Sequence, residues 1–252
     1  MKRIESSSNE LFKKTKKLLT RSGRKKAGKF IIEGERIVRD ALNGRAKIDY
    51  IFVNDSFCND LNGDFESNRV YVLTDKLFNE LTDTVNTQGI LAVCDYMDCD
   101  ADDIDYCKGK YLYLDCVCDP GNMGTIIRSA DAFGVDGIVL SDGCVDVFNP
   151  KVLRSTMSGI FNVKIYFDSG DVLNKFRDNG FKIAGTFLED AINADKFDYC
   201  GKCVIIMGNE ANGICPRTEK MCTHRITIPM TGGAESLNVA VACGIILYEA
   251  SK

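Results

Sequence analysis

The chain has 252 residues, and its 45% of apolar residues is enough to build one large or two small hydrophobic cores. With 32 basic and 36 acidic side chains the net charge is −4, and this composition excludes a disordered or fibrous chain. A single histidine, His224, argues against a histidine-rich metal site and against a Ser–His–Asp triad.

The twelve cysteines are spread through a chain that is long enough to be stabilised by a hydrophobic core, so it does not need disulfide bonds to fold. The first ten residues, MKRIESSSNE, are polar and the next segment is rich in lysine, so we expect no signal peptide. No apolar run approaches the ~20 residues that a membrane-spanning helix needs. These features predict a cytoplasmic protein with reduced thiols and no membrane partner.

Charge is distributed unevenly along the chain. Residues 1–47 carry 15 Lys and Arg against 5 Asp and Glu, a net charge of +10, whereas the remainder carries 17 against 31, a net charge of −14. A basic N-terminal segment, here residues 1–47 and called the basic head below, followed by an acidic remainder is typical of proteins that bind polyanions. A solvated basic helix gives the same pattern.

The first predicted helix follows Ser7-Ser8-Asn9-Glu10, which has the form of a capping box, and apolar residues recur after it at helical spacing among lysines. After Gly23 we expect a basic turn, followed by alternating strands and helices. Strands are predicted at KFIIEG, IDYIFV, RVYVL and ILAVCDY, and helices at GERIVRDALNG and TDKLFNELT. Residues 1–95 are therefore expected to form a small α/β domain.

Residues 96–109 are expected to form an acidic linker, because they contain many aspartates and almost no aliphatic side chains. The aspartates also suggest calcium, but the segment lacks the glycine and the terminal glutamate of a calcium-binding loop.

From Lys110 onward, strands that are apolar throughout alternate with helix-length segments, which predicts a largely parallel sheet covered on both faces. The strands are predicted at YLYLDC, GIVLS, VKIYF, FKIAGTF, KCVIIMG and RITIPM, and the helices at residues 122–133, near PKVLRSTM, near DVLNKFRDNG and from Ser236. In such a sheet a ligand binds beyond the carboxyl ends of the strands.

Three segments at those strand ends carry glycine and polar residues. In the first, residues 119–128, Asn122 is placed to cap a helix and Arg128 follows nearly two turns later, although a capped helix with a surface arginine is the simpler interpretation. The second, residues 208–213, suits close backbone approach to a ligand. The third, residues 228–238, precedes a helix of small residues that can pack closely, inside the fold or between subunits. Neither a dinucleotide fingerprint nor a P-loop is present.

The pair Cys200 and Cys203 forms a C-x-x-C motif, but it precedes a strand, whereas a thioredoxin-like pair follows one. Cys215 and Cys222 are separated by six residues, which is too many for the second half of a zinc site. We therefore expect no metal.

Together, the three polar segments resemble the motifs of the SpoU (TrmH-like) RNA ribose 2′-O-methyltransferases of the SPOUT superfamily. DPGNMGTIIRSADAFGVDGIVL resembles the first motif, IIMGNEANGI the second and IPMTGGAESLNVAVACGIILYEA the third. The segment FIIEGERIVRDAL is similar to the ribosomal-protein-like domain that binds substrate in many of these enzymes. The resemblance implies an α/β fold with an RNA-binding domain at 1–95 and a parallel-sheet SPOUT domain at 110–252. It further implies a deep trefoil knot that holds S-adenosylmethionine, and a homodimer packed near that knot.

The resemblance also implies roles for individual residues. Gly208, Ile228 and Leu237 match cofactor-binding positions, and Asn209 and Met230 lie beside them in the same motifs. Thr186, at the end of the FKIAGTF strand, is added to this set. Those that match the transfer site are Arg128, Asn122, Glu210, Ser236 and Asn238. Ala211 stands where the second motif more often has glycine, and its methyl group requires a negative φ for an unstrained loop.

A ribose 2′-hydroxyl is a weak nucleophile, so methyl transfer needs alignment and help in losing the proton. A guanidinium stays protonated, so our hypothesis is that Arg128 contacts the target phosphate and the ribose oxygen instead of acting as a base. The side chains expected to meet RNA phosphates are Lys13, Lys14, Lys16, Lys17, Arg24, Lys25 and Lys26.

Ribosomal RNA is the favoured substrate, because relatives that act on tRNA usually carry helical extensions instead of a full N-terminal domain. A tRNA ribose methyltransferase is the nearer alternative. A non-catalytic RNA-binding member of the fold is the other, and the intact polar set argues against it.

Overall fold

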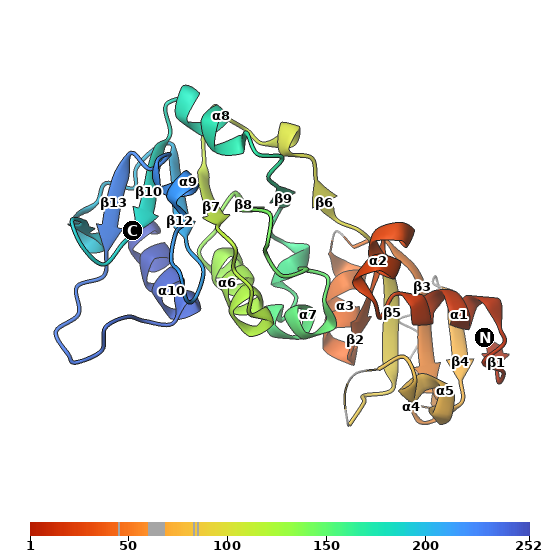
Figure 1. Ribbon diagram of the computed structural model, residues 1–252. Helices are drawn as coiled ribbons and strands as arrows, with labels where there is room; N and C mark the ends of the chain where they lie inside the picture. Colours follow the sequence, from red (N-terminus) through yellow and green to blue (C-terminus); the bar gives the residue numbers. More distant parts are fainter. Residues whose placement is uncertain (45, 60–68, 83, 85) are drawn as a thin grey trace. The chain divides into compact units, whose positions relative to one another are not determined.

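The computed structural model describes residues 1–44, 46–59, 69–82, 84 and 86–252, and within it the chain forms two compact units (Figure 1). The N-terminal unit comprises Met1–Met97 and Asp146–Phe161, and the C-terminal unit comprises Asp98–Val145 and Asn162–Lys252. This division differs from the expected one in the segment 146–161, which belongs with the N-terminal unit although it lies within the sequence of the expected methyltransferase domain.

The N-terminal unit is built on a mixed five-stranded sheet with the order β1-β4-β3-β5-β2. Strand β3 pairs in parallel with β4 and antiparallel with β5, and β5 pairs antiparallel with β2. The strands are β1 (Lys2–Ile4), β2 (Lys29–Glu33), β3 (Ile48–Asn54), β4 (Val70–Leu73) and β5 (Ile90–Asp95), and three helices are α3 (Glu35–Asn43), α4 (Asp55–Asn59) and α5 (Asp75–Asn79). The strands predicted here are confirmed, and β1 is an addition.

Two further helices, α1 (Glu10–Lys17) and α2 (Arg21–Ala27), carry most of the basic head. The side chain of Asn9 caps α1 by accepting the N–H groups of Leu11 and Phe12, as expected for the predicted helix start. The basic turn predicted after Gly23 is wrong, because these residues continue a helix that Thr20 caps through the N–H of Gly23.

The segment 146–161 contains α7 (Pro150–Thr156) and the short 3-10 helix η3 (Gly159–Phe161), and α7 packs against β2. The ring of Phe148 lies 4.7 Å from that of Phe30 and stacks at 4.3 Å on that of Tyr96. Phe148 is 2% exposed, so these aromatic contacts bury a segment that the chain reaches only after the first strands of the C-terminal unit.

The C-terminal unit contains eight strands in the order β11-β13-β10-β12-β7-β8-β9-β6, and every pairing in it is parallel. The strands are β6 (Asp98–Cys99), β7 (Lys110–Leu114), β8 (Gly137–Leu140), β9 (Ile165–Phe167), β10 (Lys182–Thr186), β11 (Ile192–Asn193), β12 (Cys203–Met207) and β13 (His224–Thr227). The helices are α6 (Pro120–Ala132), α8 (Val172–Asp178), α9 (Pro216–Glu219) and α10 (Val239–Ala250). The predicted parallel sheet is confirmed.

Both faces of this sheet are covered, as the continuous apolar strands predict. All five residues of β12 are buried, and alternate ones, Val204 and Ile206, lie in a core cluster that includes Phe176 of α8. Because successive side chains of a strand point to opposite faces, the remaining residues of β12 are buried on the other face. Helix α6 packs against α10.

Two predictions for this unit need correction. The expected acidic linker supplies the edge strand β6, which pairs with β9, and the 3-10 helix η2 (Ala101–Asp103), and Ala101 and Ile104 are buried. Helix α10 begins at Val239 instead of at Ser236, because the side chain of Asn238 caps it. In the described residues no helix combines the length and the apolar character needed to span a membrane.

Candidate functional site

The loop after β7 leads into α6 through a capped helix start. The carboxylate of Asp119 accepts the N–H of Asn122 at 2.8 Å, and Pro120 occupies the first helical position, where a missing N–H costs nothing. Asn122 therefore lies in the first turn of α6, at the carboxyl edge of the sheet.

The loop after β12 is a tight turn that presents Glu210. Asn209 and Gly213 exchange two backbone hydrogen bonds of 2.9 Å, and Gly213 has a φ of +67°. A Cβ at Gly208 would lie 2.3 Å from the carbonyl carbon of Gly213, so only glycine fits there. Ala211 is not among the residues with positive φ, so its methyl group introduces no backbone strain.

Glu210 connects the two loops. One carboxylate oxygen accepts the N–H of Asp119 at 2.9 Å and the side-chain amide of Asn122 at 3.0 Å, while the other accepts the N–H of Cys118 at 3.2 Å and the side-chain amide of Asn209 at 3.3 Å. The carboxylate thus receives four donors, which fits an ionised acceptor.

Asn238 completes this polar cluster from the third segment. Its side-chain N–H donates to Oδ1 of Asn122 at 2.9 Å, and its own Oδ1 accepts the N–H groups of Ala240 and Val241 at the start of α10. The chain of contacts Glu210, Asn122 and Asn238 orients each amide uniquely, because every group in it has a defined donor or acceptor role.

The hydrogen bonds at Glu210 also set its charge state. Burial alone raises the pKa of this carboxyl, but the hydrogen bonds from Asn122 and from the backbone of Asp119 and Cys118 outweigh that effect and hold the pKa below its ordinary value of 4.5. Glu210 is therefore ionised throughout the neutral range.

The lowered pKa of Glu210 predicts how the unfolding free energy of the protein depends on pH. The ionised Glu210 stabilises the fold fully above its unfolded-state pKa, and this contribution is lost as the pH falls through the lower folded-state pKa. We expect the difference in unfolding free energy between the wild type and Glu210→Gln to be constant from neutral pH down to about pH 5 and to shrink below it. Urea unfolding of both proteins across this range measures it, and a difference that stays constant down to about pH 3 contradicts the assignment.

A cavity of about 520 Å³ opens beside the polar cluster, at the carboxyl ends of β10, β12 and β13 and against α10. Its volume lies within the range of small-molecule sites. All six residues expected to bind a cofactor line it, namely Thr186, Gly208, Asn209, Ile228, Met230 and Leu237. Four of the five expected transfer-site residues line it as well, namely Asn122, Glu210, Ser236 and Asn238.

Arg128 is the fifth, and it does not line the cavity. It lies on α6 nearly two turns beyond Asn122, its side chain is exposed, and within the described residues it has no hydrogen bond or ion pair. His224 lies apart from the polar cluster, with Nδ1 against the hydroxyl of Thr223 and its ring packed on Phe197.

The sequence did not single out Phe187, which forms part of the cavity wall after β10. The guanidinium carbon of Arg225 lies 3.6 Å from the centre of the Phe187 ring, and Glu219 holds that arginine at 2.6 Å. A Cβ at Gly185 would lie 2.6 Å from the same ring, so the ring is enclosed on that side also. Its position could have been predicted from the sequence, because Phe187 ends FKIAGTF and so directly follows a strand at the edge of the sheet where a ligand binds.

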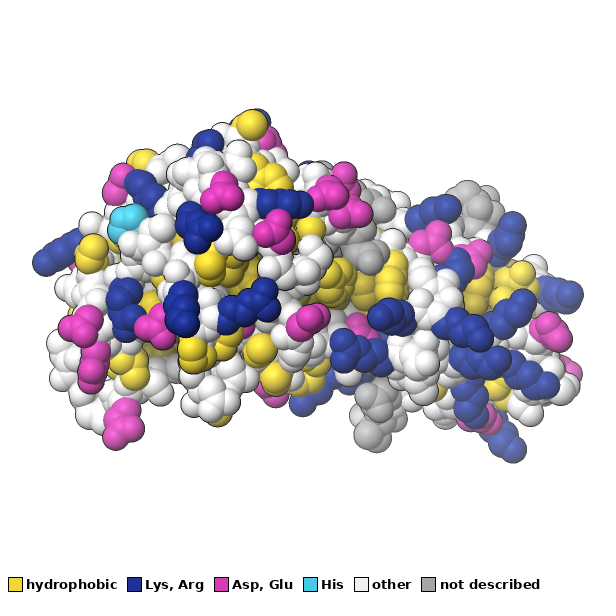
Figure 2. Space-filling model, turned by 45° about the horizontal axis from the view of Figure 1, so that its top comes forward, with side chains coloured by type: hydrophobic (Ala, Val, Ile, Leu, Met, Phe, Trp, Pro, Cys, Tyr) yellow, Lys and Arg dark blue, Asp and Glu magenta, His cyan; other side chains and the backbone are white. Residues whose placement is uncertain are grey.

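The basic side chains expected to meet RNA lie on α1 and α2, and Figure 2 shows Lys and Arg side chains gathered over this part of the N-terminal unit. The exposed ones are Lys13, Lys14, Lys16, Lys17, Lys25 and Lys26. Lys16 is paired with Glu80 at 2.6 Å. Arg24 is a correction: it is 3% exposed and bound to Asp146, so its guanidinium is not available to a phosphate.

The cysteines show no metal site. None of the twelve forms a disulfide bond, and in the described residues no group of three or more His, Cys, Asp or Glu side chains is placed to hold a metal ion. Cys203 is buried in β12 while Cys200 is exposed, so this C-x-x-C pair does not form one ligand face.

Comparison with known proteins places this geometry in a family. The model of the SpoU rRNA Methylase family matches residues 109–248, which is more than half of the chain. The chain belongs to this family. A second model, the MRM3-like substrate binding domain, matches residues 9–92. The first match therefore includes the segments that form the cavity, and the second includes the basic helices α1 and α2.

Several relatives of this SpoU-family chain match it from end to end. The 23S rRNA (guanosine(2553)-2′-O)-methyltransferase RlmP of Bacillus subtilis is 35% identical over 250 residues, covering 98% of each chain. The crystal structure of an AdoMet-bound rRNA methyltransferase from Sinorhizobium meliloti has a TM-score of 0.88 at 30% identity and covers 99% of this chain and 97% of that one. The SpoU methyltransferase AviRb of Streptomyces viridochromogenes, in complex with AdoMet, has a TM-score of 0.86 at 27% identity and covers 96% and 97%.

Proposed function

We propose that this protein transfers the methyl group of S-adenosylmethionine to the ribose 2′-hydroxyl of a nucleotide in ribosomal RNA. The observation that carries the proposal is the cavity at the carboxyl edge of the parallel sheet, with the cluster of Glu210, Asn122 and Asn238 at its side. The full-length match to an rRNA 2′-O-methyltransferase supports this reaction class and this substrate class.

The residues present fit S-adenosylmethionine. The cavity is large enough, and its lining combines apolar side chains such as Ile228 and Leu237 with the backbone of Gly208, where a Cβ would meet Gly213. When bound, this cofactor supplies an electrophilic methyl group on a sulfonium centre. The protein's own contribution is to bind it beside the polar cluster and to exclude water.

Within this proposal the polar cluster positions the ribose. Glu210 stays ionised and orients Asn122, which in turn orients Asn238, so the exposed polar atoms of these side chains hold the nucleotide against the cavity. Ser236 is exposed at the same rim and offers a further hydroxyl. The guanidinium of Arg128 contacts the target phosphate and the ribose oxygen, and its positive charge favours loss of the hydroxyl proton.

The N-terminal unit binds the RNA in this proposal. The exposed lysines of α1 and α2 meet phosphates, and the match to a substrate-binding domain over residues 9–92 supports this role. The reaction takes place in the cytoplasm, where the free thiols stay reduced. A trefoil knot in the C-terminal unit remains a prediction from the family resemblance.

Incubation with labelled S-adenosylmethionine and separate pools of unmodified ribosomal RNA and tRNA tests the function. We expect label in ribosomal RNA, in dinucleotides that resist alkali because the blocked 2′-hydroxyl cannot attack its phosphate. Label in tRNA alone contradicts the proposed substrate, and binding of RNA without any label identifies a non-catalytic member of the fold.

We also propose that the protein is a homodimer that packs through α10. Val241, Ile245 and Tyr248 are 52%, 37% and 52% exposed and share one face, while Ala242 and Ile246, on the adjacent face of the helix, line the cavity. Three large and partly exposed apolar side chains at this spacing form a stripe, at whose end the Tyr248 ring also contacts Phe133, and a second copy of the same helix covers the stripe by symmetry.

The prediction is that Ile245→Asp converts the dimer to a monomer, because it places a charge in the centre of the stripe. Sedimentation velocity measures the change. Ile192→Asp is the matched control, since Ile192 is 47% exposed in the same unit but lies on β11, and it is expected to leave the dimer intact. A wild-type protein that sediments as a monomer contradicts the proposal.

A further inference from the structure

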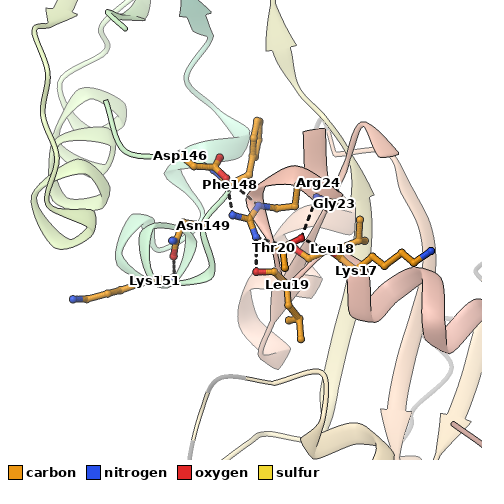
Figure 3. Close-up of polar contacts among 10 residues, drawn as sticks. All are labelled: Lys17, Leu18, Leu19, Thr20, Gly23, Arg24, Asp146, Phe148, Asn149 and Lys151. Atoms are coloured by element: carbon orange, nitrogen blue, oxygen red, sulfur yellow. Dashed lines mark hydrogen bonds and ion pairs between the residues drawn. The ribbon is translucent and has the colours of Figure 1, made fainter. Parts of the chain in front are cut away.

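A buried guanidinium joins three segments of the N-terminal unit (Figure 3). Arg24, on α2, donates from Nη1 to the carbonyl oxygens of Leu18 and Leu19, at 2.8 and 3.1 Å, where α1 ends. From Nε and Nη2 it donates to Oδ2 of Asp146, at 3.0 and 2.6 Å. One side chain therefore holds the end of α1, the middle of α2 and the segment 146–161 together.

The corner between the two basic helices is tight. A Cβ at Gly23 would lie 1.9 Å from the carbonyl oxygen of Lys17, so the backbones approach as closely as glycine allows. Thr20 caps α2 through Gly23 and also donates its hydroxyl to the carbonyl of Lys17. The short connection and the guanidinium together set the angle between α1 and α2.

Asp146 is itself fixed by its surroundings. Its Oδ1 accepts the N–H of Phe148 at 3.0 Å, and Phe148 is buried against Phe30 and Tyr96. The Asp146 side chain is only 12% exposed. Because each charge of this pair is largely removed from water, loss of either partner leaves the other uncompensated.

The exposed lysines lie on both helices that this pair joins. Lys13, Lys14 and Lys17 are on α1, and Lys25 and Lys26 are on α2, one and two residues after Arg24. Simultaneous contact with successive phosphates of one RNA requires a fixed arrangement of the two helices, since affinity grows with the number of phosphates neutralised together.

We propose that Arg24 and Asp146 are positioning residues for RNA binding, which hold α1 and α2 so that the lysines of both helices meet phosphates of one RNA at the same time. This inference rests on the proposed function in assigning RNA to this surface. It makes Asp146, an acidic residue that the sequence places far from the basic head, necessary for binding a polyanion.

The proposal and simple electrostatics predict opposite changes in RNA affinity for Asp146→Asn. Removing a negative charge strengthens binding to a polyanion if charge alone matters. Under the proposal the same change frees Arg24, loosens the corner and weakens binding, by about fivefold or more at moderate salt, with a smaller dependence of affinity on salt. Arg24→Lys keeps the net charge, but a lysine cannot bind both carbonyl oxygens and the carboxylate at the same time. We therefore expect Arg24→Lys to weaken RNA binding as well.

The experiment measures affinity of the full chain for protein-free ribosomal RNA by filter binding across a salt series, without S-adenosylmethionine. Asp75→Asn is the matched control, because Asp75 is an exposed residue of the N-terminal unit and its substitution changes the charge equally. Thermal unfolding identifies variants that do not fold, and Arg24→Lys supplies the test if Asp146→Asn is one of them.

The expected result is weaker binding and a lower salt slope for both variants, a higher KM for RNA, and unchanged kcat and S-adenosylmethionine affinity. Binding by Asp146→Asn that equals or exceeds that of Asp75→Asn, or unchanged binding by Arg24→Lys, overturns the inference. Wild-type RNA binding without methylation contradicts the proposed function but leaves this comparison intact, so the two failures are distinguishable.

Discussion

Arg128→Ala is expected to lower kcat/KM for methyl transfer by about 10²- to 10³-fold while leaving S-adenosylmethionine affinity nearly unchanged. Arg128 is exposed, does not line the cavity and has no partner within the described residues, so its removal disturbs neither the cofactor site nor the core. What it removes is the positive charge proposed to contact the phosphate and the ribose oxygen. Single-turnover methylation and calorimetric titration of the cofactor measure the two quantities.

Two further variants sharpen this result. Arg128→Lys keeps the charge but not the two-pronged donor geometry, so we expect it to recover part of the lost activity. Arg177→Ala, which removes an exposed arginine of α8 in the same unit, is the control and should retain full activity. Wild-type turnover by Arg128→Ala refutes the assignment of this residue to the transfer step.

Glu210→Gln is expected to reduce methyl transfer by about 10²-fold, because a displacement of the reacting groups by about 1 Å is enough to cost that much. The glutamine places an N–H₂ group where the carboxylate now receives the N–H groups of Cys118 and Asp119 and two side-chain amides. Donors then face donors, Asn122 turns away, and Asn238 loses its acceptor. Steady-state kinetics at saturating cofactor and RNA measure the effect.

The matched control is Glu189→Gln, a change of the same charge at an exposed residue of the C-terminal unit that does not line the cavity, and it should leave kcat unchanged. Glu210→Asp separates charge from reach: it stays ionised but is one methylene shorter, so we expect an intermediate activity. Equal activity of Glu210→Gln and the wild type would show that the polar cluster does not position the ribose.

Much of the site could be predicted because its residues directly follow strands of a parallel sheet. Parallel strands end at one edge of a sheet, so the polar residues after the predicted strands had to converge, and Asn122, Glu210 and Asn238 do so. Their individual roles came from the family motifs. The start of α10 was misplaced because Ser236 and Asn238 are both good capping residues, and only the hydrogen bonds distinguish them.

The buried state of Arg24 could not be predicted, because it depends on a partner 122 residues away. An arginine among lysines on a helix gives the same sequence pattern whether its side chain faces solvent or is buried against a carboxylate. The edge strand β6 was missed for a related reason. The aspartates of that segment mark it as polar, and its pairing with β9 is a long-range contact that no local pattern records.

The interleaved segment 146–161 constrains the order in which the protein can fold during synthesis. The N-terminal unit lacks Phe148 and α7 until residue 161 has left the ribosome, and by then β7, α6 and β8 of the other unit have already been made. The surfaces of Phe30 and Tyr96 that Phe148 covers stay open meanwhile. Domains usually complete folding in order from the N-terminus, whereas here neither unit can be completed before part of the other has emerged.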